Sequence, residues 1–181
     1  MSAFIKLVLE KGYDAFTVGE VADRANVGRS TLYVHFTGKQ DLLNACIGGP
    51  SSMMASIVAQ NCAAAAIMPL VDHFLEQRAR HRVFYFPMQS VWIRNLAGRI
   101  EPTIARLARE SAARPLLSPK LVAHLIAEMQ IGFIQSCLTA PVVPKSEAIA
   151  EALVASTRAM LAALLGTRLG AMQRPAEAKK G

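Results

Sequence analysis

The stretch VGRSTLYVHFTGKQDLL, residues 27–43, combines small polar residues, two aromatic side chains, a histidine and isolated basic groups within a few helical turns. Leu32 and Phe36 are four residues apart, so they fall on one face of a short helix. The pattern predicts a helix over 28–34 whose apolar face packs on a core and whose other side chains face outward. Thr37 and Gly38 end this segment, and a further helix is expected to begin near Lys39.

The residues before this stretch supply the rest of a helical motif. Residues 3–11 have helical spacing, and Gly12 is expected to end that helix. Thr17 is a candidate N-cap, and Glu20 three residues later completes a capping-box pattern. Residues 26–28 form a tight connection to the helix over 28–34. Two short helices joined by such a turn and packed on a preceding helix form a helix-turn-helix, whose second helix enters the major groove of DNA.

The outward residues of the helix over 28–34 are therefore candidate DNA contacts. Arg29, Ser30 and Thr31 lie at its N-terminal end, where a recognition helix meets base edges. Arg29 can donate two hydrogen bonds to a guanine, although a phosphate contact is an open alternative. Tyr33 and His35 carry polar tips suited to phosphate oxygens. Taken singly, each of these side chains also fits an ordinary solvated helix surface.

Two more phosphate contacts are expected at helix starts. Free backbone amides and the helix dipole favour an anion there, and Thr17 and Lys39 occupy such positions. Residues 27–40 contain Arg29 and Lys39 and no acidic residue. For Lys39 the alternative is an ordinary surface lysine.

The segment EKGYDAFTVGEVADRANVGRSTLYVHFTGKQDLL, residues 10–43, resembles the DNA-binding domain of the TetR family of bacterial ligand-responsive transcriptional regulators. The resemblance rests on the EKGY turn, the TVGEVADRA helix and the TLYVHFTGKQDLL run, in that order. It implies a homodimer in which each C-terminal domain holds an effector pocket that controls the spacing of two DNA-binding domains. The first helix starts later than is usual in the family, and Gly28 replaces the usual Ser at the N-cap of the recognition helix. The downstream part of the chain resembles the family only in length and helical content.

Prolines divide the downstream region into helix-sized pieces, and no stretch shows the alternation of a β-strand. We therefore predict an all-α protein. Gly48, Gly49 and Pro50 suggest a hinge between a helix-turn-helix domain, 1–48, and an effector-binding and dimerisation domain, 49–170, before a disordered tail, 171–181. Pro87 is expected to kink or divide its helix. The expected downstream helices are 51–68, 70–82, 84–98, 102–113, 119–139 and 145–166.

Charge and composition limit the choice of partners. The formal net charge is +7, yet residues 1–48 carry five basic and five acidic groups, so bulk charge does not by itself indicate nucleic-acid binding. Residues 42–71 carry no charge, and their part 53–71 is long enough for a membrane span, but Gln60 and Asn61 interrupt it. We expect no membrane partner. Three cysteines without CxxC spacing and no signal peptide indicate a reducing cytoplasm.

Aromatic side chains gather between 82 and 95 around a proline, with polar groups interleaved. Core packing explains most of them, but a ligand pocket is also apolar with a few placed polar groups. The candidate effector pocket comprises Phe84, Phe86, Met88, Gln89, Trp92, Met129 and Phe133. The small-residue stripes of 119–139 and 145–166 suggest a four-helix dimer interface, with burial inside one subunit as the alternative.

No enzyme motif is present: the chain has no GxSxG, no GxGxxG, no Walker-type loop and no paired carboxylates on a helix face. The histidines lack metal-ligand spacing, so we predict no catalytic residues, no metal site and no cofactor. The sequence favours a repressor released from palindromic operator DNA by a small apolar or amphiphilic effector. The alternative is a helical ligand-binding or scaffolding protein with impaired DNA binding.

Overall fold

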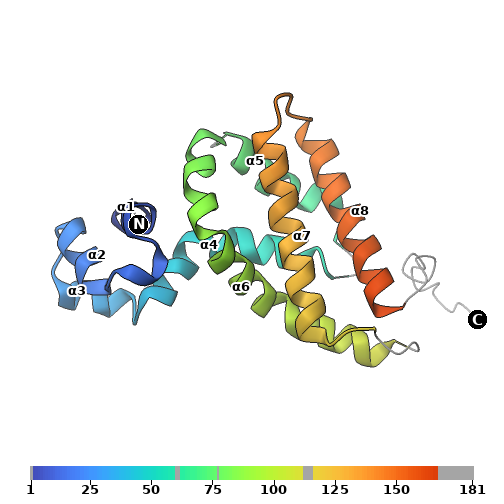
Figure 1. The fold of residues 1–181 in the computed structure, drawn as a ribbon, viewed down its shortest axis with the longest axis horizontal. Helices are drawn as coiled ribbons and strands as arrows, with labels where there is room; N and C mark the ends of the chain where they lie inside the picture. The colour runs from blue at the N-terminus through green and yellow to red at the C-terminus, as the bar shows by residue number, and fades with distance from the viewer. Residues whose placement is uncertain (1, 60–61, 77, 112–115, 167–181) are drawn as a thin grey trace, which may run out of the picture.

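The computed structural model describes residues 2–59, 62–76, 78–111 and 116–166, and the side chains of these residues except those of 78–88. Every regular element in these ranges is helical, which confirms the all-α prediction (Figure 1). The elements are α1 (Ser2–Lys11), η1 (Tyr13–Ala15, a 3-10 turn), α2 (Val18–Ala25), α3 (Arg29–His35), α4 (Lys39–Ser56), η2 (Ala64–Ala66, a 3-10 turn), α5 (Met68–Glu76), α6 (Arg78–Glu110), α7 (Pro119–Thr139) and α8 (Ser146–Leu165).

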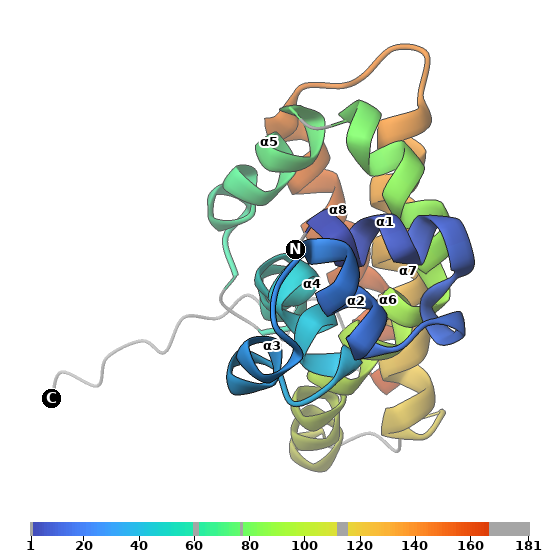
Figure 2. The ribbon, with the colours of Figure 1, turned by 90° about the vertical axis from the view of Figure 1, so that its left-hand side faces the viewer.

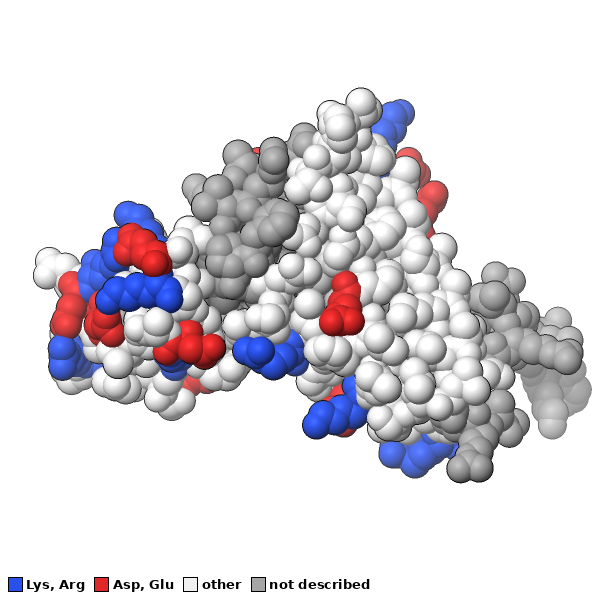
Figure 3. Space-filling view, in the orientation of Figure 1, with Lys and Arg blue, Asp and Glu red and all other residues white. Residues whose placement is uncertain are grey.

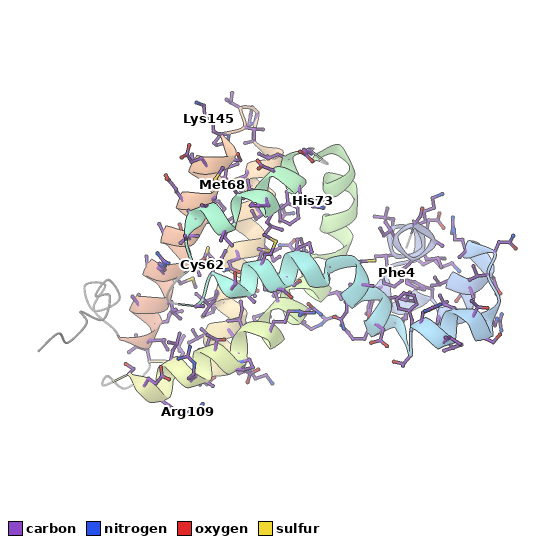
Figure 4. All side chains as sticks on the ribbon, turned by 180° about the vertical axis from the view of Figure 1, so that it is seen from behind. Phe4, Cys62, Met68, His73, Arg109 and Lys145 are labelled. Carbon is purple, nitrogen blue, oxygen red and sulfur yellow. The ribbon has the colours of Figure 1, made fainter. Side chains whose placement is uncertain are left out.

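The first three helices and the beginning of α4 form a domain at one end of the molecule, which we call the head (residues 2–47; Figures 1 and 2). Its centre is aromatic. The ring of Phe4 is fully buried and meets Tyr13 and Phe16 edge-on, at centroid distances of 6.3 and 5.7 Å (Figure 4). Leu42 and Leu43 of α4 are buried in the same core. Helix α4 is therefore part of the packing that holds the head together.

Local sequence sets the turn between α2 and α3. Thr17 is the N-cap of α2: its Oγ1 accepts a hydrogen bond from the Glu20 backbone N–H at 3.2 Å, and the Thr17 N–H donates to the Glu20 carboxylate at 2.8 Å. This confirms the predicted capping box. Asn26 ends the helix in the left-handed conformation, with φ of 53°. Asparagine tolerates that conformation better than most residues, so the chain reverses sharply before α3.

The structure shows no interruption of the helix at 48–50, where a hinge was expected. Helix α4 runs from Lys39 to Ser56 with Gly48, Gly49 and Pro50 inside it. Proline has no N–H to continue the helical ladder, but packing on α6 compensates along this stretch. One α4 helix thus extends from the head into the second part of the molecule, and the proposed boundary between domains 1–48 and 49–170 falls within it.

The expected division of the following helices is also wrong in part. Helix α4 ends at Ser56, so no helix covers 51–68, and α5 covers only Met68–Glu76. The pieces expected at 84–98 and 102–113 join in one helix, α6, which continues through Pro87 and Pro102. Burial explains this continuity, because α6 packs along α7 through side chains three or four residues apart. These buried residues are Trp92, Leu96, Ile100, Ile104 and Leu107.

Helices α7 and α8 confirm the predictions for 119–139 and 145–166. By length and composition alone, both could cross a membrane, but core helices of soluble proteins meet the same criterion. One face of each is buried against the rest of the domain, through Ile126 and Ile134 of α7 and Leu153 and Leu161 of α8. The predicted tail, 171–181, lies outside the described residues.

Candidate nucleic-acid interface

Helix α3 lies on the outside of the head, at the end of the molecule far from α8 (Figures 1 and 2). Leu32 and Phe36 are half-buried and pack against the core, as predicted. The predicted contact residues of this helix all lie on its exposed side: Arg29, Ser30, Thr31, Tyr33 and His35. The chain therefore presents the N-terminal end of a short helix, with its polar side chains, to the surroundings.

The side chain of Arg29 is held in place by α2. Its Nη2 and Nε donate to the two carboxylate oxygens of Asp23 at 2.8 and 3.4 Å. A Cβ built on Gly19 would lie 3.4 Å from the guanidinium, so α2 closely approaches the arginine. The hydrogen bond to Asp23 raises the pKa of Arg29, which keeps the guanidinium charged. Asp23 therefore orients the guanidinium without burying it, because both side chains are largely exposed.

Apolar side chains around α3 are also exposed. Val34 is 79% exposed, Tyr33 52% and Val27 41%. Periodicity did not predict the exposure of Val34, because an apolar residue in a short helix is expected to be buried. Exposed apolar side chains on and next to α3 suit contact with thymine methyl groups.

Lys39 is half-buried, so it is not an ordinary surface lysine. Its Nζ donates to the backbone carbonyl oxygens of Tyr13 at 2.8 Å and Asp14 at 3.3 Å. The ammonium also lies 5.1 Å from the ring centroid of Tyr13 and 5.0 Å from that of Phe16. These contacts join α4 to η1. They leave one of the three ammonium N–H groups for a phosphate.

Thr17 is exposed at the start of α2, but its hydroxyl already accepts the capping hydrogen bond from Glu20. Lys11 donates to the Glu20 carboxylate at 2.6 Å. This hydrogen bond, with those from Thr17, lowers the pKa of Glu20 to about 2. Glu20 thus stays ionised and keeps the first turn of α2 in place, next to the surface that carries Thr17.

Comparison with known proteins agrees with this geometry. Residues 1–46 match the family model described as bacterial regulatory proteins, tetR family. The head is therefore similar to the DNA-binding part of that family. The match covers the head, in which the helix-turn-helix lies.

Two curated relatives cover different parts of the chain. An uncharacterised HTH-type transcriptional regulator of Bacillus subtilis, YvkB, is 38% identical over 60 residues, which are 33% of this chain and 32% of YvkB. The TetC protein of transposon Tn10 from Escherichia coli is 23% identical over 121 residues, 58% of this chain and 61% of TetC. The chain thus spans about a third of the first relative's length and less than two thirds of the second's.

A solved structure is similar over most of the chain. It is the Thermus thermophilus TetR-family repressor FadR in complex with lauroyl-CoA, which is 19% identical, covers 99% of this chain and 97% of its own, and has a TM-score of 0.43.

The side chains predicted to line an effector pocket are only partly described. The side chains of Phe84, Phe86 and Met88 lie outside the described residues. Gln89, Met129 and Phe133 are half-buried. Trp92 is 1% exposed, so it is a core residue, and its indole N–H donates to Ser51 Oγ at 2.8 Å.

Gln130, a polar side chain of α7, has one acceptor atom without a partner among the described residues. Gln130 is fully buried, and its Nε2 donates to the Met54 carbonyl at 3.3 Å and to Thr157 Oγ1 at 3.2 Å. Thr157 gives its own proton to the Leu153 carbonyl at 2.8 Å, so it can only accept from Gln130. Both neighbours need a donor, which fixes the orientation of the amide and leaves Gln130 Oε1 without a partner among the described residues. A buried acceptor of this kind is suited to a donor supplied by a ligand or a water molecule.

Proposed function

We propose that this protein is a sequence-specific DNA-binding transcriptional regulator that reads a palindromic operator with α3. The observation that carries the proposal is the exposed N-terminal end of α3, with Arg29 oriented by Asp23, in a head that matches the TetR family model. Ser30 and Thr31 lie beside Arg29, where a recognition helix meets base edges. Tyr33, His35, Thr17 and Lys39 then contact phosphates.

The proposed active form is a homodimer built from α7 and α8. A row of alanines on α8 is exposed in the single chain, at the spacing of one helix face: Ala148, Ala152, Ala155, Ala159 and Ala163. The surface over α7 carries few charged side chains, whereas charges of both signs gather on the head (Figure 3). Small residues allow helices to approach closely, which favours a four-helix interface between two subunits.

The proposed effector is a small apolar or amphiphilic molecule that binds beside α7 and weakens DNA binding. Gln130 would accept a hydrogen bond from it, which favours a ligand with a hydroxyl or amide N–H. Helix α4 is the proposed transmitter because it joins the head core to the second core without a break. It is tied to α6 by hydrogen bonds from Asn95 to Asn44 at 2.9 Å and from Arg99 to Ser52 at 3.2 Å. A ligand that prefers one tilt of α4 shifts the distance between the two heads.

The alternative function is a helical ligand-binding or scaffolding protein that does not read DNA. It is distinguished from a regulator by DNA binding of the full chain. We would mix the purified protein with a library of random-sequence duplexes, recover the bound DNA and sequence it over several rounds. The proposal expects an inverted repeat whose half-sites lie one helical turn apart, about 34–36 Å. Recovery of unrelated sequences without a repeat would favour the alternative.

A further inference from the structure

A groove of about 590 Å³ lies between α6 and the first two turns of α7. This volume is within the usual range of small-molecule sites. None of the residues assigned to the core effector pocket lines it. The lining residues are Arg94, Ala97, Gly98, Glu101, Ser118, Lys120, Leu121 and His124.

The charged side chains of the groove favour an anion. Arg94 and Lys120 are exposed, and neither forms an ion pair with a carboxylate in the part of the chain that the structure describes. Glu101 is the single acidic side chain of the lining. His124 faces the groove and lies 3.5 Å from Glu128, which is outside it. Two free cations against one carboxylate leave the groove with a net positive charge at neutral pH.

The remaining lining is apolar and open. Leu121 of α7 is 44% exposed, and Ala97 of α6 also lines the groove. A Cβ added to Gly98 would meet no atom within 4 Å, so the floor of the groove has free space at this position. Basic groups beside an apolar wall match a molecule with an anionic end and an apolar body. The size of the groove excludes a DNA duplex.

We propose that the groove between α6 and α7 binds a small organic anion with an apolar body, held by Arg94 and Lys120. The site is distinct from the core region around Trp92 and Gln130 and does not depend on DNA binding. It lies close to the head. The charge of Arg94 acts on Tyr13 of η1 and partly offsets the rise in the pKa of Tyr13 that burial and Asp14 cause.

A matched pair of fluorescent probes tests the proposal: 8-anilino-1-naphthalenesulfonate, and N-phenyl-1-naphthylamine, which has the same rings without the sulfonate. The full chain should bind the sulfonate more tightly than the uncharged amine. Arg94→Gln and Lys120→Gln should each weaken sulfonate binding about tenfold, the loss expected for one charge-assisted contact. Both variants should leave binding of the amine unchanged. Glu101→Gln should strengthen sulfonate binding, because it removes the carboxylate that lines the groove.

A blocking variant separates the groove from other apolar sites. Gly98→Leu places a side chain in the free space of the groove and should abolish the sulfonate binding that depends on Arg94. Gly49→Leu is the matched control, because a Cβ at Gly49 of α4 also meets no atom within 4 Å and Gly49 lies outside the groove. Circular dichroism checks that each variant is folded. Sulfonate affinity that is unchanged in both Arg94→Gln and Gly98→Leu would overturn the proposal.

Discussion

Replacement of Lys39 by methionine should destabilise the head, whatever its effect on DNA binding. The change keeps most of the aliphatic side chain but removes the ammonium that donates to the Tyr13 and Asp14 carbonyls at 2.8 and 3.3 Å. It also removes the charge that lies 5.0 Å from the Phe16 ring centroid. A hydrogen bond from a charged donor contributes about 1.5–3 kcal/mol and a cation–π contact at an exposed site about 0.5–1 kcal/mol. Because Lys39 is only half-buried, we expect a total loss of about 1.5–3 kcal/mol.

Differential scanning calorimetry at a fixed protein concentration measures this loss. In a chain of this size, each kcal/mol shifts the midpoint by about 2–4 °C, so Lys39→Met should melt about 3–12 °C below the wild type. The control is Lys6→Met, since Lys6 is exposed on α1. Lys6→Met should melt within about 2 °C of the wild type. If Lys39→Met unfolds at the same midpoint temperature as the wild type but no longer binds DNA, the structural role is refuted. Lys39 would then act only as a phosphate contact.

Arg29→Ala should relax base preference at one position of each half-site by about 1–3 kcal/mol, as measured by fluorescence anisotropy on operator variants; an equal loss of affinity for operator and random DNA would mean that Arg29 contacts only phosphate. The pKa of Glu20 is lowered from 4.5 to about 2 in the folded protein. Its ionised form therefore stabilises the fold fully above about pH 4.5, and this contribution is lost as the pH falls toward 2. The difference in unfolding free energy between wild type and Glu20→Gln should therefore shrink over that range in urea titrations, and a difference independent of pH would contradict it. Ala155→Glu places a charge in the proposed α8 interface and should yield monomers in light scattering at micromolar concentration, whereas Ala66→Glu, at an exposed position in η2, should not.

Short-range signals predicted the head well. The Thr17 and Glu20 capping box, the turn at Asn26 and the outward face of α3 depend on residues within a few positions of one another. Local backbone physics determines such features, so periodicity and capping preferences are sufficient to find them.

Contacts between distant residues explain what the sequence did not predict. Proline and glycine at 48–50 locally favour a break, yet packing of α4 on α6 keeps the helix continuous. Lys39 reaches carbonyl groups 26 and 25 residues earlier in the chain, and no local pattern indicates that contact. The groove with Arg94 and Lys120 likewise forms only when α6 and α7 pack together.

The central claim is that the exposed end of α3 reads DNA sequence. Its most direct test is the ratio of affinities for a selected operator and for a scrambled duplex of the same composition, measured at one salt concentration. The wild type should prefer the operator by at least about a thousandfold. The triple variant with Arg29, Ser30 and Thr31 changed to Ala should lose most of this preference and keep most of its affinity for the scrambled duplex, because Tyr33, His35 and Lys39 remain. A wild-type ratio near one, or a ratio that survives in the triple variant, would contradict the account.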